Sequence, residues 1–163
     1  MVAGFRPQKD QDTIIRALKY LPDNFHLFLV GDGERRDVLK ELVEKENLND
    51  RVHFWGIRND VPSLLKASDY IIMSSHYEGL SLSSLEGMCV GKPFFASDVD
   101  GLREVVNGAG ILFTHEDSLA LAEKILSLEN NKEKCLQIAV YCFQKVVLFD
   151  INKMTSQYRN VYI

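Results

Sequence analysis

The sequence is poor in cysteine: three occur in 163 residues, and their number is odd. None of Cys89, Cys135 and Cys142 has a second cysteine or a histidine at a spacing typical of metal ligands, which argues against a disulfide framework or a zinc site built on them. Each of them lies inside a helical pattern. We therefore expect three reduced packing thiols and a cytoplasmic location.

An excess of basic residues is also missing, as are long hydrophobic runs. The chain has 19 Lys and Arg against 23 Asp and Glu, a net charge of −4, so it lacks the basic surface that nonspecific nucleic-acid binding requires. Apolar runs such as Leu27–Val30 and Tyr70–Met73 are far shorter than the roughly 20 residues that cross a bilayer. The composition thus predicts neither a nucleic-acid partner nor a membrane-spanning domain.

The chain does contain short apolar runs that alternate with longer amphipathic stretches. Continuous apolarity indicates strands buried on both faces of a parallel sheet, and the stretches between them have helical periodicity. The expected strands are Val2–Phe5, Leu27–Val30, Val52–Trp55, Tyr70–Met73, Pro93–Ala96 and Gly110–Phe113. The expected helices are Asp12–Leu21, Glu34–Glu46, Val61–Ala67, Leu80–Val90 and Gly101–Val106. This order predicts an α/β fold, a Rossmann-like doubly wound parallel sheet with helices on both faces.

The length and composition fit one domain over residues 1–163, with a purely helical last part. A hydrophobic content of 46% with 26% charged residues is that of a globular domain with a proper core. After Glu116 the apolar residues follow helical spacing to the end of the chain. Asn130 and Asn131 are the expected break between two of these helices, and Asp150 is the expected cap of the last one.

Two carboxylates, Glu78 and Glu86, flank the segment where a strand is expected to turn into a helix. If the helix begins near Leu80, its free backbone N–H groups form an anion site beyond the strand's end. The carboxylates would repel a phosphate, so they are expected to accept hydrogen bonds from sugar hydroxyls, as an acidic residue does in dinucleotide folds. This arrangement predicts a sugar nucleotide as the ligand.

The helical phase places Glu86 beside an apolar surface. At 100° per residue, Leu82, Leu85 and Cys89 form one apolar stripe, and Glu86 lies on its edge, where a carboxylate needs a partner. The alternative interpretation is that Glu86 pairs with a nearby basic residue or backbone amide, and that Glu78 is a solvated loop acid.

Short motifs follow one another in a fixed order along nearly the whole chain. They are Pro7-Gln8-Lys9, Val30-Gly31-Asp32-Gly33-Glu34, Val52 to Gly56 followed by Asp60-Val61-Pro62, Ala67-Ser68-Asp69, Ser74 to Leu82, Leu85-Glu86-Gly87-Met88, Gly91-Lys92-Pro93, Ala96-Ser97-Asp98 and Gly101 to Val106. Each motif alone is weak. In this order, with seven residues between the two acids, the chain resembles the C-terminal, donor-binding domain of retaining glycosyltransferases of family four, which have the GT-B fold.

The resemblance implies roles for the residues that match the family's motifs. Lys9 is expected to neutralise the pyrophosphate of the donor, whose leaving group gains charge in the transition state. Glu86 would hold the ribose diol and Glu78 the hydroxyls of the transferred sugar, so Lys9 and Glu78 are the expected catalytic residues. The backbone N–H groups expected to face the sugar and the diphosphate are those of Gly79, Leu80 and Ser81.

One position departs from the family pattern. The family carries a second phosphate-binding residue, an arginine, four or five residues before the lysine, and Gly4 stands at that position here. Arg6 is close in sequence but out of phase on an expected strand, where neighbouring side chains point to opposite faces. Either Arg6 substitutes through a shifted backbone, or the phosphate site is weakened and catalysis is impaired.

The base of the nucleotide is expected near Ile57 and Arg58, where backbone groups after a strand can read its edge and the guanidinium can stack on its face. Both uracil and guanine stay open. Gly31 and Gly33 permit a close approach of backbone to the ligand, although a plain strand-to-helix turn accounts for them equally well.

No metal is expected in the reaction, because the family needs none. Asp98 and Asp100 have the spacing of a metal-binding pair, but the family has an acidic turn without metal at this position. His76 beside Glu78 invites an acid–base role, since histidine titrates near neutrality. The alternative for His76 is a loop residue packed against Tyr77.

The expected protein is a metal-independent hexosyltransferase that uses a UDP-, GDP- or ADP-sugar and no cofactor. Its acceptor would be a glycan or a lipid-linked sugar, as in the biosynthesis of cell-surface polysaccharide, with the full enzyme in the cytoplasm, at the inner face of the membrane. The N-terminal acceptor-binding domain is expected to lie outside this chain, so the isolated domain is expected to be inactive. The alternatives are a GT-B-fold sugar-nucleotide epimerase and a non-catalytic sugar-nucleotide-binding subunit.

Overall fold

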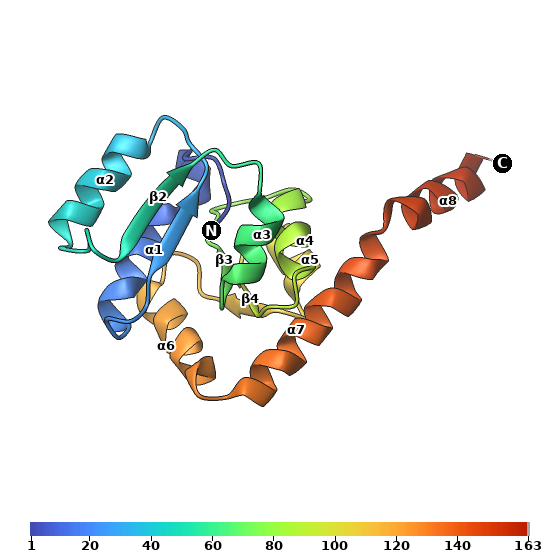
Figure 1. Ribbon diagram of the computed structural model, residues 1–163. Helices are drawn as coiled ribbons and strands as arrows, with labels where there is room; N and C mark the ends of the chain where they lie inside the picture. Colours follow the sequence, from blue (N-terminus) through green and yellow to red (C-terminus); the bar gives the residue numbers. More distant parts are fainter. Residues whose placement is uncertain (163) are drawn as a thin grey trace.

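The computed structural model describes the backbone of residues 1–162 and the side chains of these residues except 154, 157, 158 and 160–162. Its strands are β1 (Leu27–Val30), β2 (Val52–Gly56), β3 (Ile71–Met73), β4 (Phe94–Ser97) and β5 (Ile111–Phe113). All described strand pairs are parallel, and helices cover both faces (Figure 1). The expected α/β class with parallel strands is therefore confirmed.

The helices follow the predicted order, with ends that shift by a few residues. They are α1 (Gln11–Ala17), α2 (Arg36–Lys45), α3 (Val61–Ala67), α4 (Leu82–Met88), α5 (Leu102–Val106), α6 (Ser118–Glu129), α7 (Lys132–Val146) and α8 (Ile151–Tyr162), with 3-10 turns η1 (Pro7–Lys9), η2 (Leu18–Tyr20) and η3 (Val147–Phe149). Asn131 caps α7 by accepting from the N–H of Lys134, and Asp150 accepts from the N–H of Asn152. The predicted break and the predicted last cap are both confirmed.

The strands form two sheets rather than one. β1 pairs with β2 in one sheet, and β4 lies between β3 and β5 in the other. The predicted first strand, Val2–Phe5, is wrong: only Val2 forms an isolated parallel bridge, with Val30. The segment nevertheless follows the end of β1, because Ala3 N–H donates to Val30 O and Phe5 N–H donates to Asp32 O, both at 3.0 Å.

Two glycines allow this N-terminal segment to run against the end of β1. A Cβ atom on Gly31, whose φ is +137°, would lie 2.1 Å from the carbonyl oxygen of Ala3. A Cβ atom on Gly33 would lie 2.5 Å from the carbonyl oxygen of Phe5. The close approach of two backbone segments therefore accounts for both glycines, and the predicted approach of a ligand to them stays a prediction.

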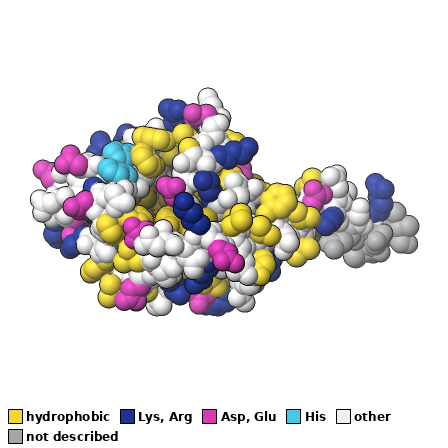
Figure 2. Space-filling view, turned by 60° about the horizontal axis from the view of Figure 1, so that its bottom comes forward, with side chains coloured by type: hydrophobic (Ala, Val, Ile, Leu, Met, Phe, Trp, Pro, Cys, Tyr) yellow, Lys and Arg dark blue, Asp and Glu magenta, His cyan; other side chains and the backbone are white. Residues whose placement is uncertain are grey.

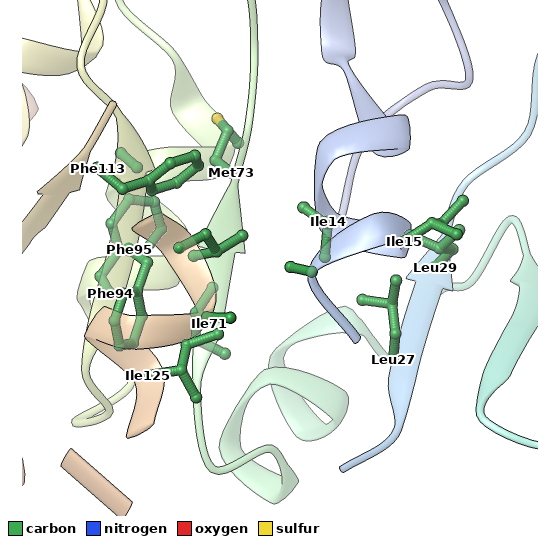
Figure 3. Close-up of a cluster of buried hydrophobic side chains, with 14 of the residues drawn as sticks. Ile14, Ile15, Leu27, Leu29, Ile71, Met73, Phe94, Phe95, Phe113 and Ile125 are labelled. Atoms are coloured by element: carbon green, nitrogen blue, oxygen red, sulfur yellow. The ribbon is translucent and has the colours of Figure 1, made fainter. Parts of the chain in front are cut away.

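The buried side chains belong to one hydrophobic cluster, which has a group on each sheet (Figure 3). One group gathers Ile14 and Ile15 of α1 with Leu27 and Leu29 of β1, and the other gathers the apolar residues of β3, β4 and β5 with Ile125 of α6. A cavity of about 520 Å³ lies between them and is lined by residues of both sheets and by Val2 of the N-terminal segment. Packing of α1 against α6 helps to hold the two halves together.

The buried face of α4 differs from the predicted one. Leu82 and Cys89 of the predicted apolar stripe are exposed, Leu82 with 70% of its surface, whereas Ser84, Gly87 and Met88 are buried. The helix lies on its small residues, because only Gly87 leaves room for the neighbouring side chains of β3 and β4. Glu86 therefore does not lie on the edge of a buried stripe.

We expect Gly87→Ala to destabilise the domain by about 1–3 kcal/mol, because the core has no space for the added methyl group. Its Cβ would lie 2.7 Å from Phe94 and 2.9 Å from Ile71. Urea unfolding followed by circular dichroism measures the effect. Gly79→Ala is the matched control, since its Cβ would meet nothing within 4 Å. Equal stabilities of the two variants would contradict the packing described for α4.

The helix α7 packs against α4, α5 and β4, and its C-terminal end and α8 extend away from the globular body (Figure 1). By length and composition alone, the stretch Lys132–Lys153 could cross a membrane, and 17% of its most apolar window is buried. The short apolar runs considered above do not reveal it, because polar residues such as Gln137 and Lys145 interrupt its sequence. An amphipathic helix with an uncovered apolar face can have the same length and composition as a membrane-spanning helix. What the structure shows here is an exposed apolar surface (Figure 2). Its most exposed large apolar residues are Leu136, Phe143, Leu148 and Ile151.

Candidate functional site

Glu78 and Lys9 form an ion pair beyond the carboxyl end of β3. Lys9 ends η1, and its Nζ donates to Oε1 of Glu78; the side chains are 18% and 7% exposed. Ser75 Oγ donates to the same oxygen at 2.5 Å, and Ser97 Oγ at the end of β4 donates to the carbonyl oxygen of Ser75 at 2.6 Å. Glu78 is thus a positioned and nearly buried carboxylate, and the interpretation as a solvated loop acid is wrong.

Glu86 is exposed on α4, and its carboxylate has no hydrogen bond or ion pair among the described residues. The alternative that it pairs with a nearby basic residue or backbone amide therefore finds no support. Burial, with the charge of Glu86, raises the pKa of the neighbouring Cys89 thiol. An acceptor without an internal partner is available to a ligand that brings donors, such as a pair of sugar hydroxyls.

The loop between Glu78 and α4 carries unpaired backbone donors. The helix begins at Leu82, two residues later than predicted, and Ser81 caps it by accepting from the N–H of Ser84. Among the described residues, the backbone N–H groups of Gly79, Leu80 and Ser81 have no hydrogen-bond acceptor. These three groups are therefore free to donate to a ligand beside Glu78.

Gly101, with φ of +81°, positions this loop from the other side. A Cβ atom on Gly101 would lie 2.0 Å from the carbonyl oxygen of Glu78 and 2.8 Å from that of Gly79. The loop between β4 and α5 therefore runs directly against the backbone of the Glu78 loop. Contact of this kind fixes the path of the Glu78 backbone without any side chain.

The Arg6 side chain lies beside Gly4, the position at which the family pattern has an arginine. The N–H of Arg6 donates to the carbonyl oxygen of Gly4 at 3.0 Å, which turns the chain back on itself. The Nε atom of Arg6 then lies 3.8 Å from the place that a Cβ atom of Gly4 would take. The prediction that Arg6 points to the opposite face assumed a strand, and the structure has a turn there instead. The Arg6 side chain is exposed and has no hydrogen bond among the described residues.

The two residues expected around the base, Ile57 and Arg58, differ in their contacts. Ile57 is 81% exposed, whereas Arg58 is held by Asp60 through two hydrogen bonds of 2.9 and 2.8 Å. The hydrogen bond to Asp60 also raises the pKa of Arg58. A base that stacks on Arg58 would therefore contact a guanidinium that Asp60 already holds in place.

Asp98 and Asp100 both contact Arg103. Its Nε donates to Asp98 at 2.6 Å and its Nη1 donates to Asp100 at 3.1 Å. A guanidinium cation thus occupies the place between the two carboxylates that a metal ion would need. This arrangement agrees with an acidic turn that serves structure rather than metal binding.

His76 contacts His115, and Asp10 lies beside them, a grouping that the sequence analysis missed. The two rings meet edge to face, with Nδ1 of His76 and Nε2 of His115 2.7 Å apart. Burial raises the pKa of the Asp10 carboxyl. The three residues are far apart in sequence, so no local spacing could have revealed them; the position of the two histidines after the ends of strands was the available signal.

The comparisons with known proteins agree with this architecture. The family model of glycosyl transferases group 1 matches residues 1–144. The chain is 31% identical to the UDP-Gal:alpha-D-GlcNAc-diphosphoundecaprenol alpha-1,3-galactosyltransferase of Escherichia coli over an alignment of 173 residues. The alignment covers 100% of this chain and 44% of that enzyme.

Solved structures with the same fold include Anabaena HepE in complex with UDP, with 29% identity and a TM-score of 0.90 over 99% of this chain and 48% of HepE. A complex of HepE with UDP-glucose is also known. The C-terminal domain of the glycosyl transferase group 1 family protein LpcC from Francisella tularensis matches with 26% identity and a TM-score of 0.79, over 92% of this chain and 85% of that domain.

The chain spans less than half of the length of the Escherichia coli relative and of HepE, yet most of the LpcC domain. Its fold, its motifs and the family match all refer to the same half of the longer proteins. The chain therefore belongs to the family of glycosyl transferases group 1 and corresponds to the C-terminal domain of their GT-B fold.

Proposed function

We propose that this chain is the donor-binding domain of a retaining, metal-independent hexosyltransferase. The observation that carries the proposal is Glu86, an exposed carboxylate on α4 that has no hydrogen-bond or ion-pair partner in the described structure. Glu78 and the free N–H groups belong to the loop that precedes α4, and Lys9 at the end of η1 pairs with Glu78. Together these groups match what a nucleoside diphosphate sugar offers: a diol, a diphosphate and sugar hydroxyls.

A uridine nucleotide is the donor that the comparisons favour. HepE binds UDP and UDP-glucose in its structures, and the printed name of the Escherichia coli relative includes UDP-Gal. The exposed Ile57 and the backbone after β2 would contact the base, with Arg58 on its face. GDP- and ADP-sugars are the competing donors that a binding experiment separates.

The proposed reaction uses the chain's own charges in place of a metal ion. When the donor binds, Lys9 exchanges Glu78 for the diphosphate, and this frees Glu78 to accept hydrogen bonds from the hydroxyls of the transferred sugar. As the bond to the leaving diphosphate breaks, Lys9, Arg6 and the loop amides stabilise the growing negative charge. The acceptor hydroxyl attacks from the same face as the leaving group, which retains the configuration.

The exposed apolar face of α7 and α8 is proposed to pack against the N-terminal, acceptor-binding domain of the full enzyme. The acceptor is proposed to be a glycan or lipid-linked sugar in the synthesis of cell-surface polysaccharide, in line with the diphosphoundecaprenol acceptor in the name of the Escherichia coli relative. The enzyme would then work in the cytoplasm at the inner face of the membrane, where such an acceptor is presented.

A thermal-shift panel tests the proposal directly. UDP and UDP-sugars are expected to raise the melting temperature of the isolated domain more than GDP, ADP and their sugars do, because only a ligand of the folded state stabilises it. In the full-length enzyme, transfer to an acceptor should accompany binding. Release of a free epimerised sugar would identify an epimerase, and binding without turnover would identify a non-catalytic subunit. No shift with any nucleotide would refute the proposal.

We expect Arg6→Ala to weaken UDP binding about tenfold, the value of one charge-assisted hydrogen bond to phosphate. Adding Gly4→Arg to this variant should restore the affinity, because a side chain at Gly4 meets only ordinary contacts in the structure. Isothermal titration calorimetry measures both effects. If Gly4→Arg strengthens binding while Arg6→Ala changes nothing, Arg6 does not replace the family's arginine.

A further inference from the structure

Asp10, His76 and His115 converge from three separate segments. Asp10 caps α1, His76 follows β3, and His115 follows β5. One potential ligand atom from each residue lies within 4.8 Å of the others. The loops are tied together near this point, since the N–H of His76 donates to the carbonyl oxygen of Gln8 at 2.8 Å and Ser74 Oγ donates to that of Asp10 at 2.6 Å.

The carboxylate of Asp10 is incompletely satisfied. The residue is 4% exposed, and its Oδ1 accepts from the N–H of Thr13 at 3.3 Å. Its Oδ2 is buried and has no hydrogen-bond partner among the described residues. A buried carboxylate oxygen without a donor or a cation costs considerable free energy, so proteins rarely leave one in that state.

A fourth oxygen and an entrance are also present. Oε1 of Glu116 lies 3.4 Å from Nδ1 of His76, on a side chain that is 65% exposed. Asp10, His76 and Glu116 line a cleft of about 560 Å³. Two basic residues share the cleft: Arg35 is held by Asp12 through hydrogen bonds of 2.6 and 3.1 Å, and Arg16 stands on α1.

We propose that Asp10, His76 and His115 bind a divalent transition-metal ion of the zinc class, with Glu116 or water as the fourth ligand. Imidazole nitrogens together with a carboxylate suit zinc better than magnesium or calcium, which prefer oxygen ligands alone. Zinc–nitrogen bonds of about 2.0–2.1 Å place two nitrogens of a tetrahedral site roughly 3.3 Å apart. The two imidazoles, now 2.7 Å apart, would therefore separate by about half an ångström.

The proposed ion lies beside the donor site but takes no part in the transfer reaction. Asp10 follows Lys9 directly, and His76 stands two residues before Glu78. An ion bound here would join the loops that carry the ion pair to the loop after β5, and so hold the donor site in one arrangement. The inference rests on the geometry of these three residues and does not depend on the nature of the donor.

The test uses the 163-residue domain without a polyhistidine tag, freed of metal by a chelator, with the exposed Cys89 replaced by serine in every protein. Zinc chloride is titrated in by calorimetry with no nucleotide present. We expect one equivalent to bind with a dissociation constant in the micromolar range or below. Cobalt chloride should give the visible absorption of a four-coordinate Co²⁺ ion with nitrogen and oxygen ligands.

Two variants should lose binding and one should keep it. His115→Ala and Asp10→Asn are expected to weaken zinc binding at least about 100-fold, since even groups that only support a ligand are worth 10–100-fold. Asparagine still caps α1, so Asp10→Asn keeps the fold. His26→Ala is the matched control, because Nδ1 of His26 lies 3.1 Å from Nε2 of His53 with no carboxylate in the pair.

The proposal is overturned if the wild-type domain binds no stoichiometric zinc. It is also overturned if His26→Ala removes the binding while His115→Ala retains it, because zinc then sits on the exposed histidine pair. Circular dichroism of each metal-free variant shows whether it is folded, so that a loss of zinc binding is not mistaken for unfolding. UDP binding measured on the same samples keeps a failure of this site separate from a failure of the donor site.

Discussion

Replacement of Glu86 by alanine is expected to weaken UDP binding about 100-fold while the melting temperature of the ligand-free domain stays the same. The carboxylate would accept two hydrogen bonds from the ribose diol, and charge-assisted hydrogen bonds are worth about 1.5–3 kcal/mol each. The carboxylate of Glu86 makes no hydrogen bond or ion pair in the described structure, so its removal costs the free protein nothing, and alanine favours the helix. Calorimetry with UDP and a thermal scan without it measure the two quantities.

Glu104→Ala on α5 is the matched control for this variant. Glu104 is also an exposed helical acid without a partner among the described residues, and it should affect neither quantity. A fall in the melting temperature of Glu86→Ala would reveal an internal partner of Glu86. Unchanged UDP affinity would remove the residue on which the proposed function depends most.

Lys9→Met is expected to lower both stability and activity, because it leaves Glu78 nearly buried with the Ser75 hydroxyl as its remaining described donor. Breaking a partly buried ion pair from one side costs about 2–3 kcal/mol, which lowers the melting temperature of a domain of this size by roughly 5–10 °C. In the full-length enzyme, loss of the cation at the leaving diphosphate should lower kcat roughly 100- to 1,000-fold. Methionine keeps the length of the side chain, so the change is mainly one of charge.

The double variant Lys9→Met/Glu78→Gln separates the two effects. A neutral amide in place of Glu78 removes the unpaired charge, and its oxygen can still accept from Ser75, so most of the stability should return. The activity should not return, because the cation is still missing. A double variant as unstable as Lys9→Met would show that the ion pair contributes little to the fold.

Much of the fold could be predicted from periodicity alone. The apolar runs at Leu27–Val30 and Ile71–Met73 are strands because they are buried on both faces, and α3 has the predicted bounds, Val61–Ala67. The segment Val2–Phe5 failed, because a strand depends on pairing partners that sequence does not show, and here the pairing is with the end of β1 alone. The prediction of the buried face of α4 failed because the small size of Gly87 outweighs the hydrophobicity of Leu82.

The candidate site was predicted in its members but not in their contacts. The resemblance named Lys9 and Glu78, yet nothing in the sequence indicates that they pair with each other or that Ser75 shares the carboxylate. The place of Arg6 depends on a turn at Gly4 that a strand-based prediction excludes. Contacts between residues that are distant in the sequence, such as those of His76 with His115, follow from the packing of loops after separate strands.

Gly31 and Gly101 bring two stretches of main chain so near each other that any added carbon collides with a carbonyl oxygen. A scan of every amino acid at every position would therefore find these sites as intolerant as the acids that grip the donor. Such a map would not separate two causes of lost function, which are loss of donor binding and a steric clash between two backbone segments. Sensitivity to mutation around this cleft will therefore mark glycines for the close passage of the main chain as well as residues that contact the donor.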